Sequence, residues 1–270
     1  MGGLSNVIEI ATATHPGMVR SHNEDSIGTD GTVGLAVLAD GMGGYNAGEV
    51  ASGIAVAMIS ADLKKALEGI DRELDVATAE RLIGEHAARA NNAIFQASQS
   101  QSQYAGMGTT LVVALWHDNK LVVGHVGDSR LYRFREGKLE QVTRDHSLLQ
   151  EQIDSGLITK EQARHSQNKN LVTRAVGIDP EVEAEVHSYP VQAGDIYLLC
   201  SDGLNDMVTD EDMELTLSSL QANLQLAAAQ LVQQANDNGG RDNVSVILVR
   251  VLKSFPARSG FIDRMKSWFR

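Results

Sequence analysis

The chain has 270 residues, a hydrophobic fraction of 43% and a formal net charge of −12. This acidic balance argues against nucleic-acid binding, which needs a basic surface. The one cysteine, Cys200, excludes an internal disulfide framework and multi-cysteine zinc patterns. Because Cys200 lies in an apolar run, we expect a buried small side chain and not a nucleophile. With no secretory signal and no apolar run long enough to span a bilayer, we expect a cytoplasmic protein.

Apolar periodicity predicts a mixture of helices and short strands in one domain, with no internal repeat and no linker. Helices that are grouped between runs of hairpins favour antiparallel sheets covered by helices over alternating parallel units. In chain order we predict a strand over 35–39, helices over 48–67 and 75–102, hairpins over 109–126 and 131–142, a polar helix-like stretch over 145–170, strands over 182–186 and 196–200, helices over 210–217 and 224–235, and a last strand over 244–251.

Four aspartates stand at the ends of these predicted strands, beside glycine or asparagine. Asp40, Asp128 and Asp202 each follow an apolar run, and Asp242 precedes the last one. If the four ends converge, the carboxylates share one pocket, where two unit charges ~4 Å apart repel by about 4 kcal/mol at an effective dielectric of ~20. Such a cluster is tolerable around cations, and oxygen ligands favour magnesium, manganese or calcium. The pattern therefore predicts a metal enzyme.

A further motif near the start places Arg20 a few residues before Glu24 and Asp25. A guanidinium binds phosphate bidentately and keeps its charge, so Arg20 is a candidate phosphate ligand. Glu24 and Asp25 would then orient metal-bound waters. Each motif taken alone is also common in ordinary turns, loops and helix caps; the prediction depends on their occurrence together.

The order of these motifs resembles the metal-dependent protein phosphatases of the type 2C family, above all the compact bacterial members. The resemblance extends from Ile8 to Val251. It rests on Arg20 with Asn23-Glu24-Asp25, Asp40-Gly41-Met42-Gly43-Gly44, Gly108-Thr109-Thr110, Gly127-Asp128-Ser129-Arg130, Ser201-Asp202-Gly203 and Asp242-Asn243.

The resemblance implies an α+β fold, a four-layer αββα sandwich in which two packed antiparallel sheets are flanked by helix pairs. It also implies two to three Mn²⁺ or Mg²⁺ ions at one end of the sandwich. Asp40 would bridge two ions and the Gly41 carbonyl would bind one of them, while Asp202 and Asp242 would complete the other. Asp128 would help to hold a third, weaker ion. The resemblance also implies that Arg20 binds the substrate phosphate and that Asn243, Glu24 and Asp25 surround the metal ligands. It further implies that 145–174 forms a mobile flap beside the active site.

By resemblance, the activity is hydrolysis of phosphoserine and phosphothreonine in proteins by a hydroxide shared between two cations, without a phosphoenzyme, opposing a bacterial serine/threonine kinase. Some family members carry a histidine after Asp-Gly as a proposed general acid, but this chain has Met42 there. His22 is the nearest histidine in sequence, and the identity of the acid stays open. Two alternatives also stay open: a metal enzyme acting on small phosphoesters or nucleic acid, and a binding protein that has lost catalysis.

The last residues have a different character from the rest. We predict a catalytic domain over 1–253 and a short tail over 254–270. Apolar residues at helical spacing, with Arg264, Lys266 and Arg270 between them, are compatible with a small amphipathic helix. Such a tail could pack on the protein itself or dock to a partner or an anionic membrane. We expect a monomer that acts on phosphorylated proteins.

Overall fold

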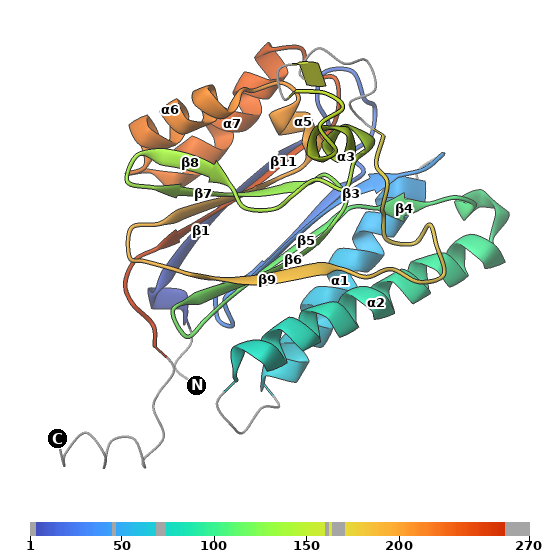
Figure 1. The fold of residues 1–270 in the computed structure, drawn as a ribbon, viewed down its shortest axis with the longest axis horizontal. Coiled ribbons are helices and arrows are strands. Elements are labelled where there is room, and N and C mark those ends of the chain that lie inside the picture. Colours follow the sequence, from blue (N-terminus) through green and yellow to red (C-terminus); the bar gives the residue numbers. More distant parts are fainter. Residues whose placement is uncertain (1–3, 45–46, 69–73, 160–161, 164–170, 257–270) are drawn as a thin grey trace.

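Two antiparallel sheets pack face to face, and helices cover both outer faces (Figure 1). The computed structural model describes residues 4–44, 47–68, 74–159, 162–163 and 171–256. The strands are β1 (Ile8–His15), β2 (Asp25–Asp30), β3 (Leu35–Met42), β4 (Gly108–Thr109), β5 (Leu111–His117), β6 (Lys120–Val126), β7 (Arg130–Arg135), β8 (Lys138–Gln141), β9 (Glu185–Pro190), β10 (Ile196–Cys200) and β11 (Val244–Val251). The helices are α1 (Ala47–Glu68), α2 (Val76–Ser100), α3 (Leu148–Asp154), α5 (Asp202–Asn205), α6 (Asp210–Leu220) and α7 (Leu224–Asp237), with 3₁₀ turns at Leu4–Asn6 and Ser102–Tyr104.

One sheet has the strand order β1-β11-β10-β7-β8 and the other has the order β2-β3-β5-β6-β9, with β4 added beside β3. Helices α1 and α2 pack on the second sheet, and α6 and α7 pack on the first. This arrangement confirms the predicted four-layer αββα sandwich.

The core has three layers because each sheet buries both of its faces. Between the sheets, Trp116 of β5 and Tyr197 of β10 meet edge to face with ring centroids 5.7 Å apart. Such a pair contributes about 0.5–1.5 kcal/mol beyond the area that it buries. Cys200 is fully buried under α6 and α7, where burial raises the pKa of its thiol. The expectation of a buried cysteine is therefore confirmed.

Local signals account for most element boundaries. The Asp75 carboxylate accepts a hydrogen bond from the Thr78 backbone N–H at 2.7 Å and caps α2, which begins one residue after the predicted start. The predicted turn between β5 and β6 has Asp118 and Asn119 at φ values of 48° and 54°. Two successive residues with positive φ are typical of a tight hairpin turn that matches strand twist. The two predicted hairpins are both present.

Two predicted elements differ from the structure. The strand predicted over 182–186 is instead β9, Glu185–Pro190. Val182 and Ala184 created the misleading apolar alternation, because they pack against the helix-side core before backbone pairing with β6 begins. In the stretch predicted to be helix-like over 145–170, the described residues form α3 over Leu148–Asp154 and two further helical residues at 162–163.

The described chain ends close to the turn between β5 and β6. Ser254 and Phe255 both bond to the Asn119 side-chain oxygen, and Phe255 is buried between the sheets. The predicted amphipathic segment lies in 257–270, outside the described residues. Of the helices that are described, none is both long and apolar enough to cross a membrane.

Candidate active site

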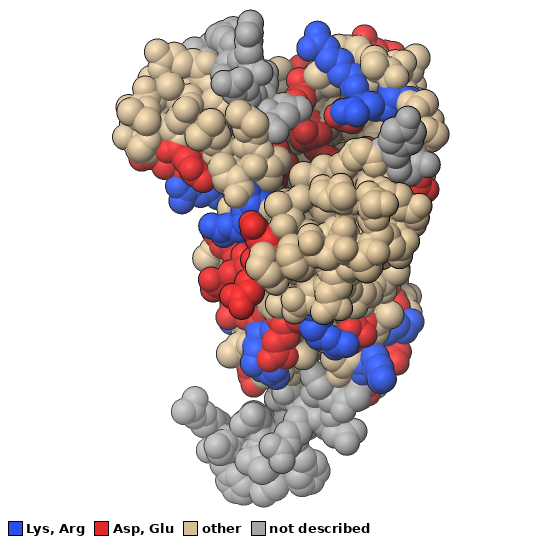
Figure 2. Space-filling view, turned by 90° about the vertical axis from the view of Figure 1, so that its right-hand side faces the viewer, with Lys and Arg blue, Asp and Glu red and all other residues tan. Residues whose placement is uncertain are grey.

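The predicted acids gather where ends of both sheets meet. Asp40 lies near the end of β3, directly opposite Asp25 of β2. Asp202 begins α5 after β10, and Asp242 precedes β11. Asp128 lies in the turn between β6 and β7. Figure 2 shows acidic side chains at the base of a hollow in one face of the molecule, with basic side chains along part of its rim.

The electrostatics of these carboxyls show that they share one environment. Burial raises the pKa of Asp40 well above its ordinary value, and repulsion from the other acids of the cluster raises it further. Burial is also the largest cause of the raised pKa of Asp202, and repulsion from Asp128 is the next largest. Burial also raises the pKa of Asp25 and of Asp128 to about 6. Without cations, each of these carboxyls is therefore harder to ionise than an isolated carboxyl.

One acid of this cluster was missed at the sequence level. Asp206 lies one helical turn after Asp202, and its charge raises the pKa of both Asp202 and Asp128. The backbone N–H of Asp206 donates to the Asp202 carbonyl at 2.8 Å. A spacing of four residues on a short helix places both side chains on one face. That spacing was the available signal.

The backbone of Asp40 is held by two threonines of the Gly108-Thr109-Thr110 motif. The Thr109 hydroxyl and the Thr110 backbone N–H both donate to the Asp40 carbonyl at 2.8 Å, and the Asp40 N–H donates to the Thr110 hydroxyl oxygen at 3.0 Å. The Thr110 and Ser129 hydroxyls are 2.7 Å apart. Gly41 is buried and pairs with Thr109 across β3 and β4. The motif thus connects Asp40 to the turn that carries Asp128.

Asn243 organises the N-terminal loop that carries Arg20. Its side-chain oxygen accepts the Glu24 N–H at 2.7 Å, and its amide group donates to the carbonyls of Pro16 and His22 at 2.9 and 2.8 Å. Burial raises the pKa of Glu24. Asn243 and Glu24 therefore lie together, in direct hydrogen-bond contact.

Arg20 reaches the cluster directly. Its guanidinium donates to an Asp242 carboxylate oxygen at 2.7 Å, and 53% of the Arg20 side chain remains exposed. This hydrogen bond is the main cause of the raised pKa of Arg20. The guanidinium is thus permanently charged, close to the acids, and accessible to an anion from solvent.

The close approach of the segments depends on small residues. A Cβ added to Gly203 would lie 2.0 Å from the Asn243 carbonyl oxygen, so only glycine lets α5 pack against the start of β11. The Ser201 hydroxyl donates to Asp25 at 2.8 Å and joins β10 to β2. The other carboxylate oxygen of Asp25 is buried without a hydrogen-bond partner.

Met42, which stands where some family members carry a histidine, and His22, the nearest histidine in sequence, lie at different depths. Met42 ends β3 and is partly buried, whereas His22 is exposed and offers its carbonyl to Asn243.

An ion pair joins Asp145, the first residue of the predicted flap, to Arg130, which follows the turn that carries Asp128. The Arg130 guanidinium holds the Asp145 carboxylate through three N–H···O contacts of 2.7–3.0 Å. The next residue, His146, stacks on His125 with ring centroids 4.7 Å apart. His125, His146 and Glu185 each offer a potential metal-ligand atom within 4.8 Å of the others. The sequence analysis did not single out these three residues.

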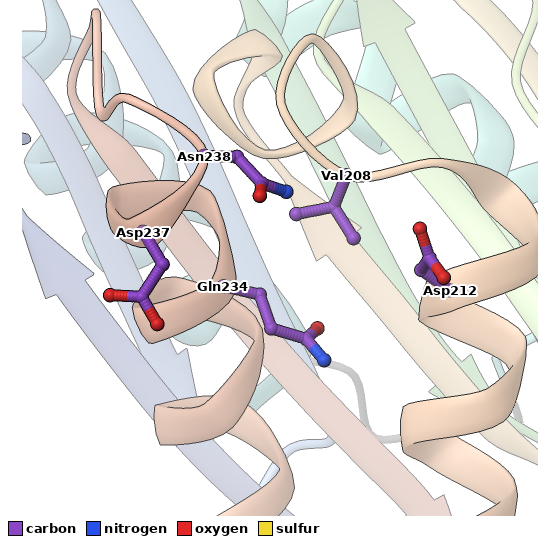
Figure 3. Close-up of a pocket in the computed structure, with 5 residues that line it drawn as sticks. All are labelled: Val208, Asp212, Gln234, Asp237 and Asn238. Atoms are coloured by element: carbon purple, nitrogen blue, oxygen red, sulfur yellow. The ribbon is translucent and has the colours of Figure 1, made fainter.

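A separate recess lies between α6, α7 and the segment after α5 (Figure 3). None of the predicted site residues lines it. Its lining consists of Val208, Asp212, Gln234, Asp237 and Asn238.

Comparison with known proteins agrees with the motif order. The chain matches the protein phosphatase 2C family over residues 18–238. It is 38% identical to the serine/threonine phosphatase stp of Listeria monocytogenes, over 87% of this chain and 93% of that protein. The solved structure of the Mycobacterium tuberculosis serine/threonine phosphatase PstP/Ppp superposes with a TM-score of 0.83 at 36% identity, covering 91% of this chain and 99% of that one. A PstP catalytic domain in complex with two manganese ions superposes with a TM-score of 0.78 at 36% identity, covering 92% and 99%.

The matched region contains Arg20, Asp40, Asp128 and Asp202, and the fold of these relatives is the fold described above. The chain belongs to the protein phosphatase 2C family.

Proposed function

We propose that this chain hydrolyses phosphoserine and phosphothreonine in proteins, using two to three manganese or magnesium ions held by the carboxylate cluster. The observation that carries the proposal is the convergence of Asp40, Asp202 and Asp128 from three chain segments beside an exposed, charged Arg20. The names of the relatives support the substrate class, and the manganese complex of PstP supports the cofactor.

The residues present fit divalent cations. Several carboxyls with raised pKa values and a buried, unpartnered Asp25 oxygen form an environment with an excess of negative charge. All of the predicted ligands offer oxygen, the donor that magnesium and manganese prefer. Asp40, the Gly41 carbonyl, Asp202 and Asp242 would hold two ions, and Asp128 a third. When bound, the ions supply the positive charge that activates water for attack on phosphorus.

Arg20 would bind the phosphate and orient it toward the cluster. In the structure its guanidinium is paired with Asp242. Substrate binding would separate this ion pair, because the phosphate would bind Arg20 and a cation would bind Asp242. Asn243 keeps the loop in place through its three hydrogen bonds. Arg20 would thus stabilise negative charge on the phosphoryl oxygens during hydrolysis.

The test is phosphate release from a phosphothreonine peptide by chelator-stripped protein, with and without manganese. We expect turnover that depends on manganese and that Asp202→Asn and Asp40→Ala each abolish, with the far-UV spectrum unchanged. A panel of sugar phosphates and nucleotides tests the small-phosphoester alternative, and calorimetry with manganese tests the silent binding protein. Turnover in the Asp40→Ala variant would contradict the assignment of the site.

We further propose that the substrates are proteins modified by a serine/threonine kinase, and that the chain acts as a cytoplasmic monomer. The net charge of −12 supports a monomer, because like-charged copies repel each other. Light scattering of the purified chain tests the oligomeric state. Deleting 260–270 and measuring activity and membrane sedimentation tests the tail.

A further inference from the structure

Gly127 and His146 are joined by a pair of hydrogen bonds. The His146 backbone N–H donates to the Gly127 carbonyl at 2.9 Å, and the Gly127 N–H donates to the His146 Nδ1 at 3.2 Å. Both residues are buried, and Gly127 directly precedes Asp128. An imidazole therefore fixes the peptide next to a carboxylate of the cluster.

These hydrogen bonds specify one tautomer of the ring. Because Nδ1 accepts a backbone N–H, the proton of the neutral imidazole resides on Nε2. Nε2 lies 3.3 Å from a Glu185 carboxylate oxygen, and the other oxygen of Glu185 is 2.9 Å from His187 Nε2. Burial, with a contribution from the neighbouring His125, lowers the pKa of His146, which favours the neutral ring. A chain of hydrogen bonds thus runs from Glu185 through His146 to Gly127.

The same residues have a spacing that a metal ion could use, but their hydrogen bonds oppose it. Coordination through His146 Nε2 would move the ring proton to Nδ1, where it would face the Gly127 N–H donor. His125 Nε2 is 2.8 Å from the Arg144 carbonyl, which requires a proton there and leaves only Nδ1 of this ring for a metal. The arrangement therefore favours a hydrogen-bond relay over a cation site.

The Asp128 turn is confined from the opposite side as well. Gly127 has a φ of 100°, and a Cβ on it would lie 2.8 Å from Thr110 side-chain carbons. Thr110 also bonds to Ser129 and to the Asp40 N–H. The turn is thus held between Thr110, which holds Asp40, and His146, which starts the flap.

We propose that His146 is a positioning residue: its neutral ring, held in one tautomer by Glu185, fixes the Gly127–Asp128 peptide and with it the Asp128 carboxylate. The ring connects the start of the flap to the weakest of the expected cation sites. This inference rests on the proposed function for the role given to Asp128.

The first test needs the parent protein alone. The ¹⁵N shifts of the His146 ring distinguish the two neutral tautomers and the imidazolium in metal-free protein. We expect the Nε2–H form at pH 7.5. An Nδ1–H ring or an imidazolium would overturn the proposal.

The second test compares His146→Asn with His146→Gln. The asparagine Oδ1 takes the place of Nδ1 and can accept the Gly127 N–H, whereas the longer glutamine carries its amide group toward the place of Nε2, where its N–H can donate to Glu185. We expect amide exchange of Gly127 in metal-free protein to be at least fivefold faster in His146→Gln than in His146→Asn, as the loss of one hydrogen bond implies. Amides of β5 and β6 serve as internal controls for the fold.

The same two variants report on cation binding. We expect the weakest manganese site, measured by calorimetry, to lose about tenfold or more in affinity in His146→Gln and to stay near the parent in His146→Asn. Equal Gly127 exchange in the two variants, or unchanged manganese affinity despite faster exchange, would overturn the proposal. Because none of these measurements needs turnover, absence of phosphate release would remove the proposed function alone.

Discussion

Replacing Asp25 with asparagine tests the electrostatic description of the carboxylate cluster. Asp25 is 9% exposed, and its pKa rises from 3.8 to about 6 chiefly because it is buried. This rise corresponds to about 3 kcal/mol, at about 1.4 kcal/mol for each pH unit. An asparagine oxygen can still accept the Ser201 hydroxyl. In chelator-treated protein at pH 7.5, we expect Asp25→Asn to raise the free energy of unfolding by up to about 3 kcal/mol, or roughly 6 °C in Tm.

The sign of the pH dependence follows from the direction of the shift. Because the folded state holds this proton more tightly than the unfolded chain, the stability of the parent falls as pH rises from about 4 to about 6. Above pH 6 the full cost is present, and below pH 4 both states are protonated. The advantage of Asp25→Asn should therefore vanish near pH 4.

The control is Asp30→Asn, for which the shift has the opposite direction. Although partial burial opposes it, hydrogen bonds from Lys64 and Thr32 lower the pKa of Asp30 to about 2. Asparagine there should lower stability at pH 7.5, by no more than about 1 kcal/mol because the ion pair is near the surface. Urea unfolding with chelator at pH 4, 5 and 7.5 is the assay. An Asp25→Asn effect of equal size at pH 4 and 7.5 would refute the reasoning.

Two further substitutions test contacts that hold the site together. Gly203→Ala would place a Cβ 2.0 Å from the Asn243 carbonyl oxygen, so we expect the free energy of unfolding in urea to fall by about 1–3 kcal/mol or more. The control is Gly84→Ala in α2, which has open space around it and should raise that free energy by up to about 1 kcal/mol. Equal effects of the two substitutions would contradict the packing argument. Arg130→Met leaves Asp145 without its ionic partner, and we expect it to destabilise the fold by about 3–5 kcal/mol. Adding Asp145→Leu to Arg130→Met should reduce this loss. If the losses of the two single variants simply add in the double variant, the pair is not coupled.

The fold was predictable wherever the local pattern and the packing agree. The turn at Asp118 and Asn119 and the cap at Asp75 depend on neighbours in sequence, so their chemistry is visible there. The strand β9 was misplaced because it is an edge strand that pairs with β6 alone. The apolar alternation at Val182 and Ala184 shifted the predicted strand toward the N-terminus, although both residues precede the pairing with β6 that begins at Glu185.

In the site, the residues that carry charge were predictable from the sequence, whereas most of the residues that orient them were not. Aspartates at strand ends can be recognised locally, but the contacts that aim them join distant segments: Asn243 to Glu24 is a separation of 219 residues, and Ser201 to Asp25 is one of 176. His146 gave no signal for a related reason, because its role lies in which ring nitrogen accepts the Gly127 N–H. Such a role appears once the chain is folded, and substitutions there should alter cation affinity before they alter the fold.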